Sequence, residues 1–506
     1  MNFVTIEQAS RVQCSFAKLD LRERARLLRR LRRAIVARRD EIVRTITEEQ
    51  GKPRFEALVM ELFPVLDMAS YLIEQAPKVL KARSADRHQP FLQTHSGCFA
   101  PRPYGLWAVI SPWNYPFSIP MISAMTFVMG GNGVVLKPSP VTPRCADLIV
   151  QLFEEAGFPD GLVSVLHGGV EAAQALIDDE HIAAVCFTGS VEGGRSVMAQ
   201  CAKAPKKALL ELGGKDAAIV LADADLERAA KGIAWASMAN AGQTCASIER
   251  CLVERQVYDR FVDLLAREIE QIRLGDPFDE STDMGPLTTQ AQFDIVRSHV
   301  KQAVSQGAKA LVGGQARPDL GERYFEPTLI ADAPLDCDLM QKETFGPVVS
   351  VRPFDDLTEA TEIANGAPFG LTASIWTKSQ KAVLEIASRL ETGVVSMNTH
   401  MTTYGEANSA WGGFKRSGIG RTHGYSGLME GVQMQYIDID EGGKPEIWWY
   451  PYSERAKTVV DDLFMFLSES SWPQRIAVSR RFLPQLGFLS RFFPLHRMMP
   501  KLLKYL

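Results

Sequence analysis

The sequence predicts an α/β protein with two domains built on parallel sheets. Short runs rich in β-branched residues alternate with helical patterns in two successive series, from Tyr104 to Leu212 and from Ala217 to Asn398. Such alternation is typical of βαβ units, whose strands pair in parallel. A length of 506 residues leaves room for two to four domains at roughly 100–200 residues each.

Composition and charge indicate an ordinary globular chain. Hydrophobic residues make up 46% and charged residues 23%, and the formal net charge is -4. These values exclude a disordered chain and disfavour a nucleic-acid partner. Eight cysteines without short, paired spacing argue against a disulfide scaffold or a zinc site. No signal-peptide core precedes Asp20, so we expect a cytoplasmic protein.

The first 85 residues predict amphipathic helices. Apolar residues recur at helical spacing from Leu27 to Val36, among arginines that extend to Arg39. A solvated basic face is favoured over a nucleic-acid site, because acidic residues such as Glu41 and Glu48 follow closely.

A stretch of 34 residues, from Pro103 to Leu136, carries no charge. It is long enough to cross a membrane, but Pro112, Pro116 and Pro120 would interrupt a spanning helix. We therefore expect a buried strand, a loop and then a buried helix. The strands expected in this first series are Trp107 to Ile110, Gly133 to Leu136, Val163 to Leu166, Ala183 to Phe187 and Ala208 to Glu211.

The second series predicts another α/β domain, and a tail of different character follows it. Its expected elements are strands at Ala217 to Leu221, Cys251 to Val253, Val348 to Phe354 and Ala373 to Thr377, and a helix at Val257 to Arg273. The tail after Ile447 is aromatic and basic, and its prolines leave no membrane-spanning run. Such a tail suits a membrane surface or a partner subunit equally well.

Cys245 stands out among the cysteines as a candidate nucleophile. It follows a stretch of small residues in which Gly242 lets the backbone approach a ligand closely. No histidine lies near it in sequence, so a different general base is needed. The other cysteines are expected to be small apolar fillers: Cys14, Cys98, Cys145, Cys186, Cys201, Cys251 and Cys337.

Two further features have both an ordinary and a functional interpretation. Glu211 ends an apolar run before two glycines, where a carboxylate serves as a cap, as an ion-pair partner or, with a pKa raised by burial, as a general base. Phe187 to Ser190 is a strand followed by a turn, with Gly193 where a helix should start and bind phosphate. The full dinucleotide fingerprint is absent.

Together these segments resemble the aldehyde dehydrogenase superfamily, from about residue 20 to about residue 435. The motifs in family order are Pro112-Trp-Asn-Tyr-Pro116, Lys137-Pro-Ser139, Phe187-Thr-Gly-Ser190, Glu211-Leu-Gly-Gly-Lys215, Gly242-Gln-Thr-Cys245, Glu343-Thr-Phe-Gly-Pro347, Asn398 and Gly412-Gly-Phe-Lys-Arg-Ser-Gly418. The spacing of 34 residues between Glu211 and Cys245 matches as well. The short N-terminal lead is similar to that of the class 3 and fatty-aldehyde branch.

The resemblance implies NAD(P)-dependent oxidation of an aldehyde to a carboxylic acid. Cys245 would form a thiohemiacetal and then a thioester, Asn114 and the backbone N–H of Cys245 would hold the oxyanion, and Glu211 would activate water. The presence of Glu211 disfavours a CoA-acylating aldehyde dehydrogenase, which is one alternative. A non-catalytic scaffold at a membrane surface is the other, and the complete residue set argues against it.

The resemblance also implies the cofactor residues. Lys137 would lie toward the adenosine ribose, Ser190 with Gly189 toward the pyrophosphate and Glu343 toward the nicotinamide ribose. Phe345 would pack against the nicotinamide, and Trp113 would line the same cleft. One departure concerns Pro140, where relatives that prefer NAD often carry a ribose-binding glutamate. We therefore expect either NAD or NADP to bind, and no metal is implied.

The expected architecture is the aldehyde dehydrogenase fold, with a Rossmann-like cofactor-binding domain, an α/β catalytic domain and a small β bridging element that makes the protein at least a homodimer. The expected ranges are 1–88 and 103–212 for the cofactor-binding domain, 213–425 for the catalytic domain, 89–102 and 431–440 for the bridging element and 447–506 for the tail. The resemblance also implies a substrate tunnel, largely apolar, which Tyr115, Ser118, Ile119, Ile122 and the loop Thr399 to Tyr404 would line. It would favour aliphatic or aromatic aldehydes.

Overall fold

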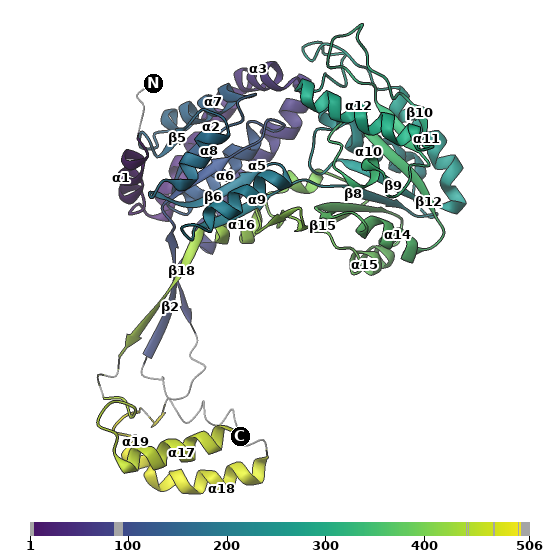
Figure 1. The fold of residues 1–506 in the computed structure, drawn as a ribbon. Coiled ribbons are helices and arrows are strands. Elements are labelled where there is room, and N and C mark those ends of the chain that lie inside the picture. The colour runs from purple at the N-terminus through teal and green to yellow at the C-terminus, as the bar shows by residue number, and fades with distance from the viewer. Residues whose placement is uncertain are drawn as a thin grey trace. The chain divides into compact units, whose positions relative to one another are not determined.

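The computed structural model describes residues 5–85, 95–441, 443, 445–468, 471–493 and 495–496. The chain forms two compact units, of which the first joins Met1–Leu80 to Pro103–Gln433 and the second joins Lys81–Arg102 to Met434–Leu506. The first unit contains two large sheets with their helices, and the second contains a small sheet and the tail helices (Figure 1).

A six-stranded sheet forms one half of the first unit. Its strands, in spatial order, are β17 (Gly418–Ile419), β7 (Lys207–Glu211), β6 (Ile182–Thr188), β3 (Leu106–Ile110), β4 (Gly133–Lys137) and β5 (Val163–Val165). All pairs are parallel except β17 with β7, and the five strands expected in this region are confirmed within two residues. The chain passes from β3 outward to β5 and then returns to the other side of β3. Ligands bind at the carboxyl ends of the strands at such a reversal.

A seven-stranded sheet forms the other half. Its order is β10 (Lys309–Val312), β11 (Thr328–Ala331), β12 (Val348–Phe354), β9 (Ile248–Glu254), β8 (Asp216–Val220), β14 (Thr372–Trp376) and β15 (Val394–Met397). Only β10 runs antiparallel to its neighbour. The four expected strands of this series are confirmed, whereas β10, β11 and β15 were not predicted. Strand β17 shows that the chain also returns from this half to the first sheet.

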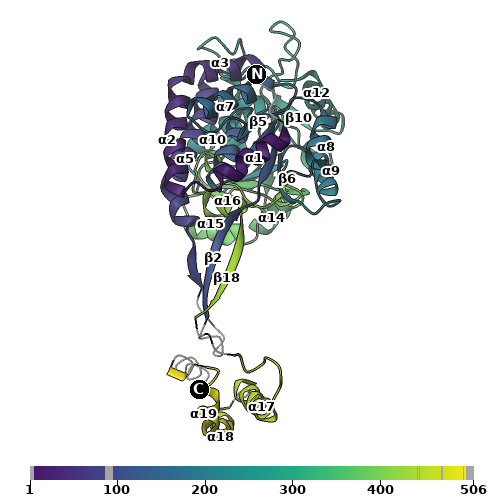
Figure 2. The ribbon, with the colours of Figure 1, turned by 90° about the vertical axis from the view of Figure 1, so that its left-hand side faces the viewer.

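Helices from the N-terminal region and between the strands cover the six-stranded sheet (Figures 1 and 2). They are α1 (Ile6–Phe16), α2 (Leu21–Ala37), α3 (Arg39–Gln50), α4 (Arg54–Glu56), the π-helix η1 (Ala57–Leu62), α5 (Phe63–Val79), α6 (Ser118–Met129), α7 (Pro143–Glu155), α8 (Val170–Asp178) and α9 (Val191–Cys201). Every residue of α6 is buried, which confirms the buried helix expected from the uncharged stretch. Among the described residues no helix is long and apolar enough to cross a membrane.

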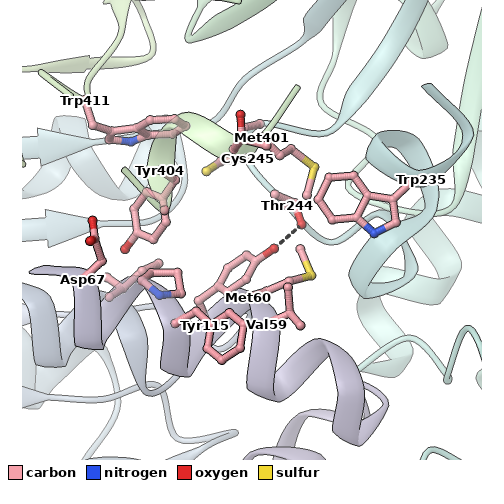
Figure 3. A pocket seen from close by; sticks show the side chains of 16 residues that line it. Val59, Met60, Asp67, Tyr115, Trp235, Thr244, Cys245, Met401, Tyr404 and Trp411 are labelled. Atoms are coloured by element: carbon pink, nitrogen blue, oxygen red, sulfur yellow. Dashed lines mark hydrogen bonds between the residues drawn. The ribbon is translucent and has the colours of Figure 1, made fainter. Parts of the chain in front are cut away.

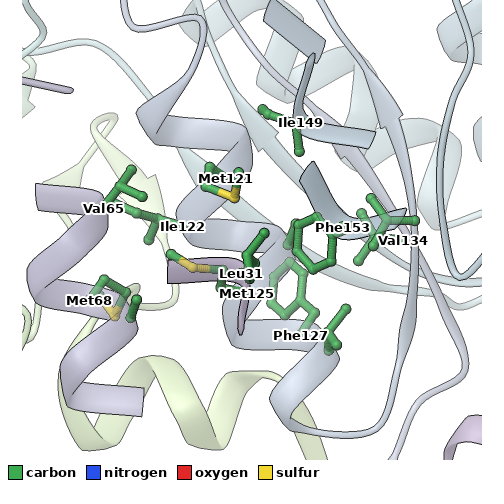
Figure 4. Packing of buried hydrophobic residues seen from close by; sticks show 14 of the residues in the cluster. Leu31, Val65, Met68, Met121, Ile122, Met125, Phe127, Val134, Ile149 and Phe153 are labelled. Carbon is green, nitrogen blue, oxygen red and sulfur yellow. The ribbon is translucent and has the colours of Figure 1, made fainter. Parts of the chain in front are cut away.

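The largest apolar cluster packs α6 against its neighbours (Figure 4). Leu31 of α2, Met68 of α5 and Phe153 of α7 meet α6 and strand β4 there. The ring of Phe127 stacks on Trp107 of β3 with centroids 3.9 Å apart. Burial of this helix on all sides fixes the loop that precedes it, which carries residues 112 to 117.

The seven-stranded sheet has its own helices and short elements. They are α10 (Leu226–Met238), the 3-10 helices η3 (Ala239–Gly242), η4 (Arg255–Val257) and η5 (Thr402–Tyr404), α11 (Tyr258–Glu270), α12 (Gln290–Ser305), α13 (Asp338–Gln341), α14 (Leu357–Asn365), α15 (Gln380–Ala387) and the paired strands β13 (Phe369–Gly370) and β16 (Phe414–Lys415). Helix α16 (Gly424–Glu430) packs instead on α5 and α6 of the six-stranded half. Helix α11 confirms the helix expected at Val257 to Arg273, with slightly shorter bounds.

The second unit contains a three-stranded sheet and the tail. The strands lie in the order β1 (Arg83–Ala85), β2 (His95–Pro103) and β18 (Val432–Asp440). Strand β18 lies inside the second range expected for the bridging element, and β2 extends one residue beyond the first, to Pro103. Residues 89–94 of that range lie outside the described residues. Strand β1 pairs with β2, although its residues were assigned to the cofactor-binding range. The tail forms α17 (Glu454–Ser468), α18 (Trp472–Phe482), η6 (Leu483–Gln485) and α19 (Leu486–Leu489), around a small apolar cluster of its own.

Candidate active site

A cavity of about 300 Å³, here called the inter-sheet cleft, lies where the carboxyl ends of β3, β6 and β7 face segments that precede β9 and β12. Eight of the nine site residues expected from the sequence line it, and Lys137 does not. The lining residues are Pro112, Trp113, Asn114, Ile119, Thr188, Gly189, Ser190, Glu211, Leu212, Gly213, Cys245, Gln292, Ile295, Glu343 and Phe345.

The loop before Cys245 is held in a backbone conformation that few residues adopt. Asn240 and Ala241 have φ values of 57° and 53°, and Gly242 has a φ of 70°. A Cβ on Gly242 would lie 2.0 Å from the carbonyl oxygen of Gly346. The glycine is therefore required by the close approach of the protein's own backbone at Gly346.

The thiol of Cys245 is half-buried and carries its proton at rest. Burial raises the pKa of Cys245 strongly, and the nearby carboxylates of Glu343, Asp216 and Glu211 raise it further. Because the thiolate is the nucleophilic form, this site needs a group that removes the proton when substrate is present.

Glu211 lies at the end of β7 and is 6% exposed. Neither of its carboxylate oxygens has a hydrogen-bond partner among the described residues. Burial raises the pKa of Glu211 well above its ordinary value, while the charge of Arg421 opposes that rise. An unpaired carboxylate with a raised pKa is suited to accept a proton near neutral pH.

Asn114 follows β3 and is buried beside Cys245 in the inter-sheet cleft. Its Nδ2 donates a hydrogen bond to the carbonyl oxygen of Gln243, at 3.0 Å, and its Oδ1 has no partner among the described residues. An amide nitrogen carries two hydrogens. One therefore ties Asn114 to the cysteine loop, and the other is free to meet a ligand.

Helix α9 begins at the cleft. Ser190 caps its first turn by accepting a hydrogen bond from the backbone N–H of Gly193, at 3.1 Å, and Gly189 precedes it. A Cβ on Gly189 would lie 2.7 Å from the ring of Phe187. Free N–H groups and the helix dipole make this terminus suited to a phosphate group.

Glu343 and two aromatic residues, Trp113 and Phe345, line another part of the cleft. Glu343 Oε1 accepts a hydrogen bond from Gly214, at 3.0 Å, and burial raises the pKa of Glu343 to about 8. A Cβ on Gly213 would lie 2.6 Å from the Glu343 carboxylate, so the glycine makes room for it. The rings of Trp113 and Phe345 meet edge to face, with centroids 5.5 Å apart.

Lys137 is the exception among the expected site residues. It ends β4, and its Nζ donates to the carbonyl oxygen of Gly168, at 3.1 Å. Burial lowers the pKa of Lys137. The residue lies at the same carboxyl edge of the sheet as the cleft, but does not line it.

A second cavity, of about 320 Å³, shares Cys245 and Ile119 with the inter-sheet cleft and is here called the apolar pocket (Figure 3). Met60, Tyr404 and Trp411 surround the space beside the thiol (Figure 3). Tyr115 fixes its ring by a 2.8 Å hydrogen bond to Thr244. Asp67, which accepts from the N–H of Ala407, is the one charged residue among those that line the pocket.

The sequence predicted part of this pocket. Tyr115, Ile119, Met401, Thr402 and Tyr404 line it, whereas Ser118, Ile122, Thr399, His400 and Thr403 do not. The lining residues that were missed are Val59, Met60, Phe63, Pro64, Asp67, Trp235, Thr244, Ala246, Gly405 and Trp411. Five of them come from η1 and α5, a helical run that is apolar on most sides. A helix that is apolar on most sides packs on more than one face, and this was the only sign in the sequence that these residues could line a pocket.

A family model for the aldehyde dehydrogenase family matches residues 4–437. The chain belongs to this family. Its fold is the aldehyde dehydrogenase fold, and it is an NAD(P)-dependent oxidoreductase that acts on aldehydes. The match covers both sheets and ends before the tail helices.

This aldehyde dehydrogenase is similar over most of its length to two curated relatives and to one solved structure. The chain is 35% identical to a 4,4'-diapolycopene aldehyde oxidase of Methylomonas sp, over 93% of this chain and 88% of that protein. It is 34% identical to a putative succinate-semialdehyde dehydrogenase [NADP(+)] of Mycobacterium ulcerans, over 90% and 88% of the two chains. An NAD-dependent aldehyde dehydrogenase from Sinorhizobium meliloti superposes with a TM-score of 0.83 at 33% identity, over 88% of each chain.

Proposed function

We propose that this aldehyde dehydrogenase oxidises apolar aldehydes to carboxylic acids, with Cys245 as nucleophile, Glu211 as general base and Asn114 as oxyanion donor. The observation that carries this proposal is the place of Cys245, which lines both the inter-sheet cleft and the apolar pocket. A substrate in the apolar pocket and a cofactor in the cleft would meet at its sulfur.

The first step is attack of the Cys245 sulfur on the aldehyde carbon, with the thiol proton passing to a base. The carbonyl oxygen becomes an oxyanion, which the free hydrogen of Asn114 Nδ2 and the backbone N–H of Cys245 stabilise. Donors placed in advance at such an oxygen are worth about 2.7–4 kcal/mol each. Burial of Asn114 keeps water from competing for its hydrogen.

The inter-sheet cleft fits NAD or NADP by its chemistry. The start of α9 with Ser190 suits the pyrophosphate, Glu343 suits ribose hydroxyls, and Trp113 and Phe345 offer apolar faces for the nicotinamide. When bound, the nicotinamide accepts the hydride that leaves the former aldehyde carbon. Pro140, which is exposed after β4, carries no charge that would repel a 2′-phosphate, so both cofactors are expected to support turnover.

The second step is hydrolysis of the Cys245 thioester. Glu211 accepts a proton from the attacking water, the bond from carbon to sulfur breaks, and the acid leaves as the thiol is restored. The unpaired, buried carboxylate of Glu211 favours this outcome over transfer of the acyl group to CoA. A scaffold without turnover would not need this set of groups around one thiol.

The lining of the apolar pocket selects the substrate class. None of the described residues that line it is a lysine or arginine, and Asp67 would repel a second carboxylate. These features favour an apolar aldehyde, such as the one named for the Methylomonas relative, over a dicarboxylate semialdehyde, such as the one named for the Mycobacterium relative.

Steady-state rates test the proposal. We would follow reduced cofactor with aldehydes from propanal to hexadecanal, benzaldehyde and succinate semialdehyde, using NAD and NADP in turn. The proposal predicts that kcat/KM rises with chain length, exceeds that for succinate semialdehyde, and disappears in Cys245→Ala. A rate that survives in Cys245→Ala, or the highest kcat/KM with succinate semialdehyde, would contradict it.

We also propose two contacts for the second unit. Strand β18 is an edge strand on which Tyr436 and Ile439 are exposed, and it suits pairing with another copy of the chain. The tail exposes aromatic residues, with Tyr450 83% exposed and Phe464 68% exposed, and Arg480 and Arg481 are exposed on α18. Aromatic and basic groups together favour an anionic lipid surface.

A further inference from the structure

A buried ion pair lies beneath the candidate oxyanion donor. Lys52 Nζ is 2.8 Å from Glu61 Oε1, and neither side chain has any solvent exposure. Lys52 follows α3 and Glu61 belongs to η1, so both come from the N-terminal helical region. Neither residue lines the inter-sheet cleft or the apolar pocket.

The pair holds the segment from Asn114 to Ser118 at both of its ends. Lys52 Nζ donates to the backbone carbonyl of Asn114, at 2.9 Å, and lies 4.0 Å from the ring centroid of Tyr115. Glu61 Oε2 accepts from the backbone N–H groups of Phe117 and Ser118, at 2.9 and 2.8 Å, where α6 begins. The backbone that carries the Asn114 amide is therefore fixed by two charged side chains.

A second set of bonds ties the same carbonyl to the nucleophile loop. Asn240 Nδ2 donates to the Asn114 carbonyl and to the Gln243 carbonyl, each at 3.1 Å. The Asn114 amide donates to that same Gln243 carbonyl. Lys52 and Asn240 thus share one acceptor, and movement of the Asn114 backbone would change the position of its amide relative to Cys245.

The π-helical turn η1 gives Glu61 its place. Val59 and Met60 of this turn line the apolar pocket, while Glu61 points to the ion pair. Such wide turns inside helices are frequent at functional sites. A buried ion pair stabilises a fold little compared with apolar side chains of the same size, because both charges lose their hydration. Stability alone therefore gives a weak reason for this pair.

We propose that Lys52 and Glu61 are positioning residues that hold the Asn114 amide where the oxyanion forms. The inference rests on the oxyanion role proposed for Asn114. Charged hydrogen bonds to the backbone on both sides restrict the segment more tightly than packing alone would. A displacement of about 1 Å in a reacting geometry can cost about a hundredfold in rate.

The test is a cycle of variants measured in the full-length protein. Lys52→Met and Glu61→Gln are combined so that no lone charge stays buried, and this pair variant is made with and without Asn114→Ala. The readouts are kcat, KM for hexanal and for NAD, and the isotope effect with hexanal deuterated at carbon 1. Lys207→Met with Glu430→Gln, which removes a partly buried ion pair remote from both cavities, is the matched control.

We expect the pair variant to lose about tenfold to a hundredfold in kcat, with KM for NAD unchanged and a larger isotope effect. Asn114→Ala should lower kcat strongly in the wild type and much less in the pair variant, because both changes remove one interaction. The control pair should leave kcat unchanged. If the ion pair served stability alone, the pair variant would have a lower melting temperature but an unchanged kcat, and Asn114→Ala would lower kcat equally with and without the pair. That result would overturn the inference.

Two other results of this experiment also have a defined meaning for the inference. If Asn114→Ala leaves wild-type kcat unchanged, the oxyanion role itself is wrong and the inference fails with it. If the pair variant does not fold, Glu61→Asp keeps the charge and shortens its reach. We then expect a folded protein with reduced kcat and the same reduced effect of Asn114→Ala, and unchanged kcat would overturn the inference.

Discussion

At the residue scale, the site combines a half-buried thiol with a buried, unpaired carboxylate. Cys245 and Glu211 both have raised pKa values, chiefly because of burial, and each carboxylate near the thiol raises its pKa further. Before substrate binds, the Cys245 thiol therefore keeps its proton and lies near the Glu211 carboxyl group, whose pKa is raised. This arrangement ties activation of the nucleophile to binding of substrate and cofactor.

Replacing Asn114 with alanine should lower kcat by about a hundredfold or more, because one prearranged oxyanion donor is worth about 2.7–4 kcal/mol. The thermal unfolding midpoint should change little, since the backbone contacts of residue 114 remain and the Gln243 carbonyl, which loses the bond from Asn114, keeps the one from Asn240. Steady-state rates with hexanal, beside a calorimetric scan, check both parts. A kcat within twofold of wild type would contradict the role given to this amide.

The rate of thioester hydrolysis should change with pH at a pKa above the range of an ordinary carboxylate. Glu211 acts as a base only when ionised, and its pKa is raised by burial, so the rate of thioester hydrolysis should increase with pH through that raised pKa and then level off. Rapid-quench measurement of acyl-enzyme decay across pH checks this. In Glu211→Gln the pH-dependent limb should be absent, and its persistence would assign the base elsewhere.

The same carboxylate should cost stability at neutral pH. Because the folded-state pKa of Glu211 is raised, the folded state holds its proton more tightly than the unfolded chain does, and stability falls as pH rises through the window between the two pKa values. Glu211→Gln removes this loss. Its melting temperature should exceed that of wild type at pH 8 and approach it near pH 4.5. No difference at pH 8 would contradict the burial argument.

Asp67 should discriminate against anionic aldehydes. Asp67→Asn keeps the oxygen that accepts from Ala407 and removes the charge, so kcat/KM for succinate semialdehyde should rise about two- to fivefold while that for hexanal stays constant. Asp160→Asn is the control, because Asp160 is also exposed and lines neither cavity. A rise for both substrates would indicate a change in the pocket itself.

At the element scale, the loop before Cys245 depends on a glycine. Gly242→Ala should destabilise the fold by more than about 3 kcal/mol, because the alanine would have to adopt a left-handed backbone conformation and its Cβ would clash with the Gly346 carbonyl. Gly307 also has a positive φ, of 103°, but open space around it, so Gly307→Ala should cost only about 1–2 kcal/mol. Urea unfolding of both variants checks this. Equal losses would show that the clash is relieved without cost.

How far elements could be predicted from the sequence depended on burial. The β-branched runs of β3, β4 and β6 are mostly buried and bounded by turns, so their pattern was clear. Strand β10 is an exposed edge beginning at Lys309 and has no apolar alternation to mark it. The pairing of Lys52 with Glu61 was also missed, because two charges nine positions apart in a helical region look like ordinary solvated residues.

At the scale of the whole molecule, the family match covers the first unit, and it ends before the tail helices. The motifs predicted the inter-sheet cleft well, since eight of nine residues line it. The apolar pocket was predicted only in part, because its walls come from helices that approach in space and share no sequence motif. Tertiary packing, which no local pattern records, decides which helix face reaches the thiol.

Binding of the tail to anionic lipid should depend on its exposed charges. Arg480→Gln with Arg481→Gln should reduce sedimentation with phosphatidylserine vesicles, and added salt should do the same to wild type. The control, Arg29→Gln with Arg33→Gln, removes two exposed charges from α2 and should bind as wild type does. Equal sedimentation of all three proteins would remove the lipid role.

The most direct test of the whole account is mass spectrometry of Glu211→Gln after incubation with hexanal and NAD. Without the base that hydrolyses the thioester, the protein should gain the mass of one hexanoyl group, located on the peptide that contains Cys245, while wild type should show no lasting adduct. An unmodified Glu211→Gln protein that still forms hexanoate, or an acyl group on a different residue, would contradict the account.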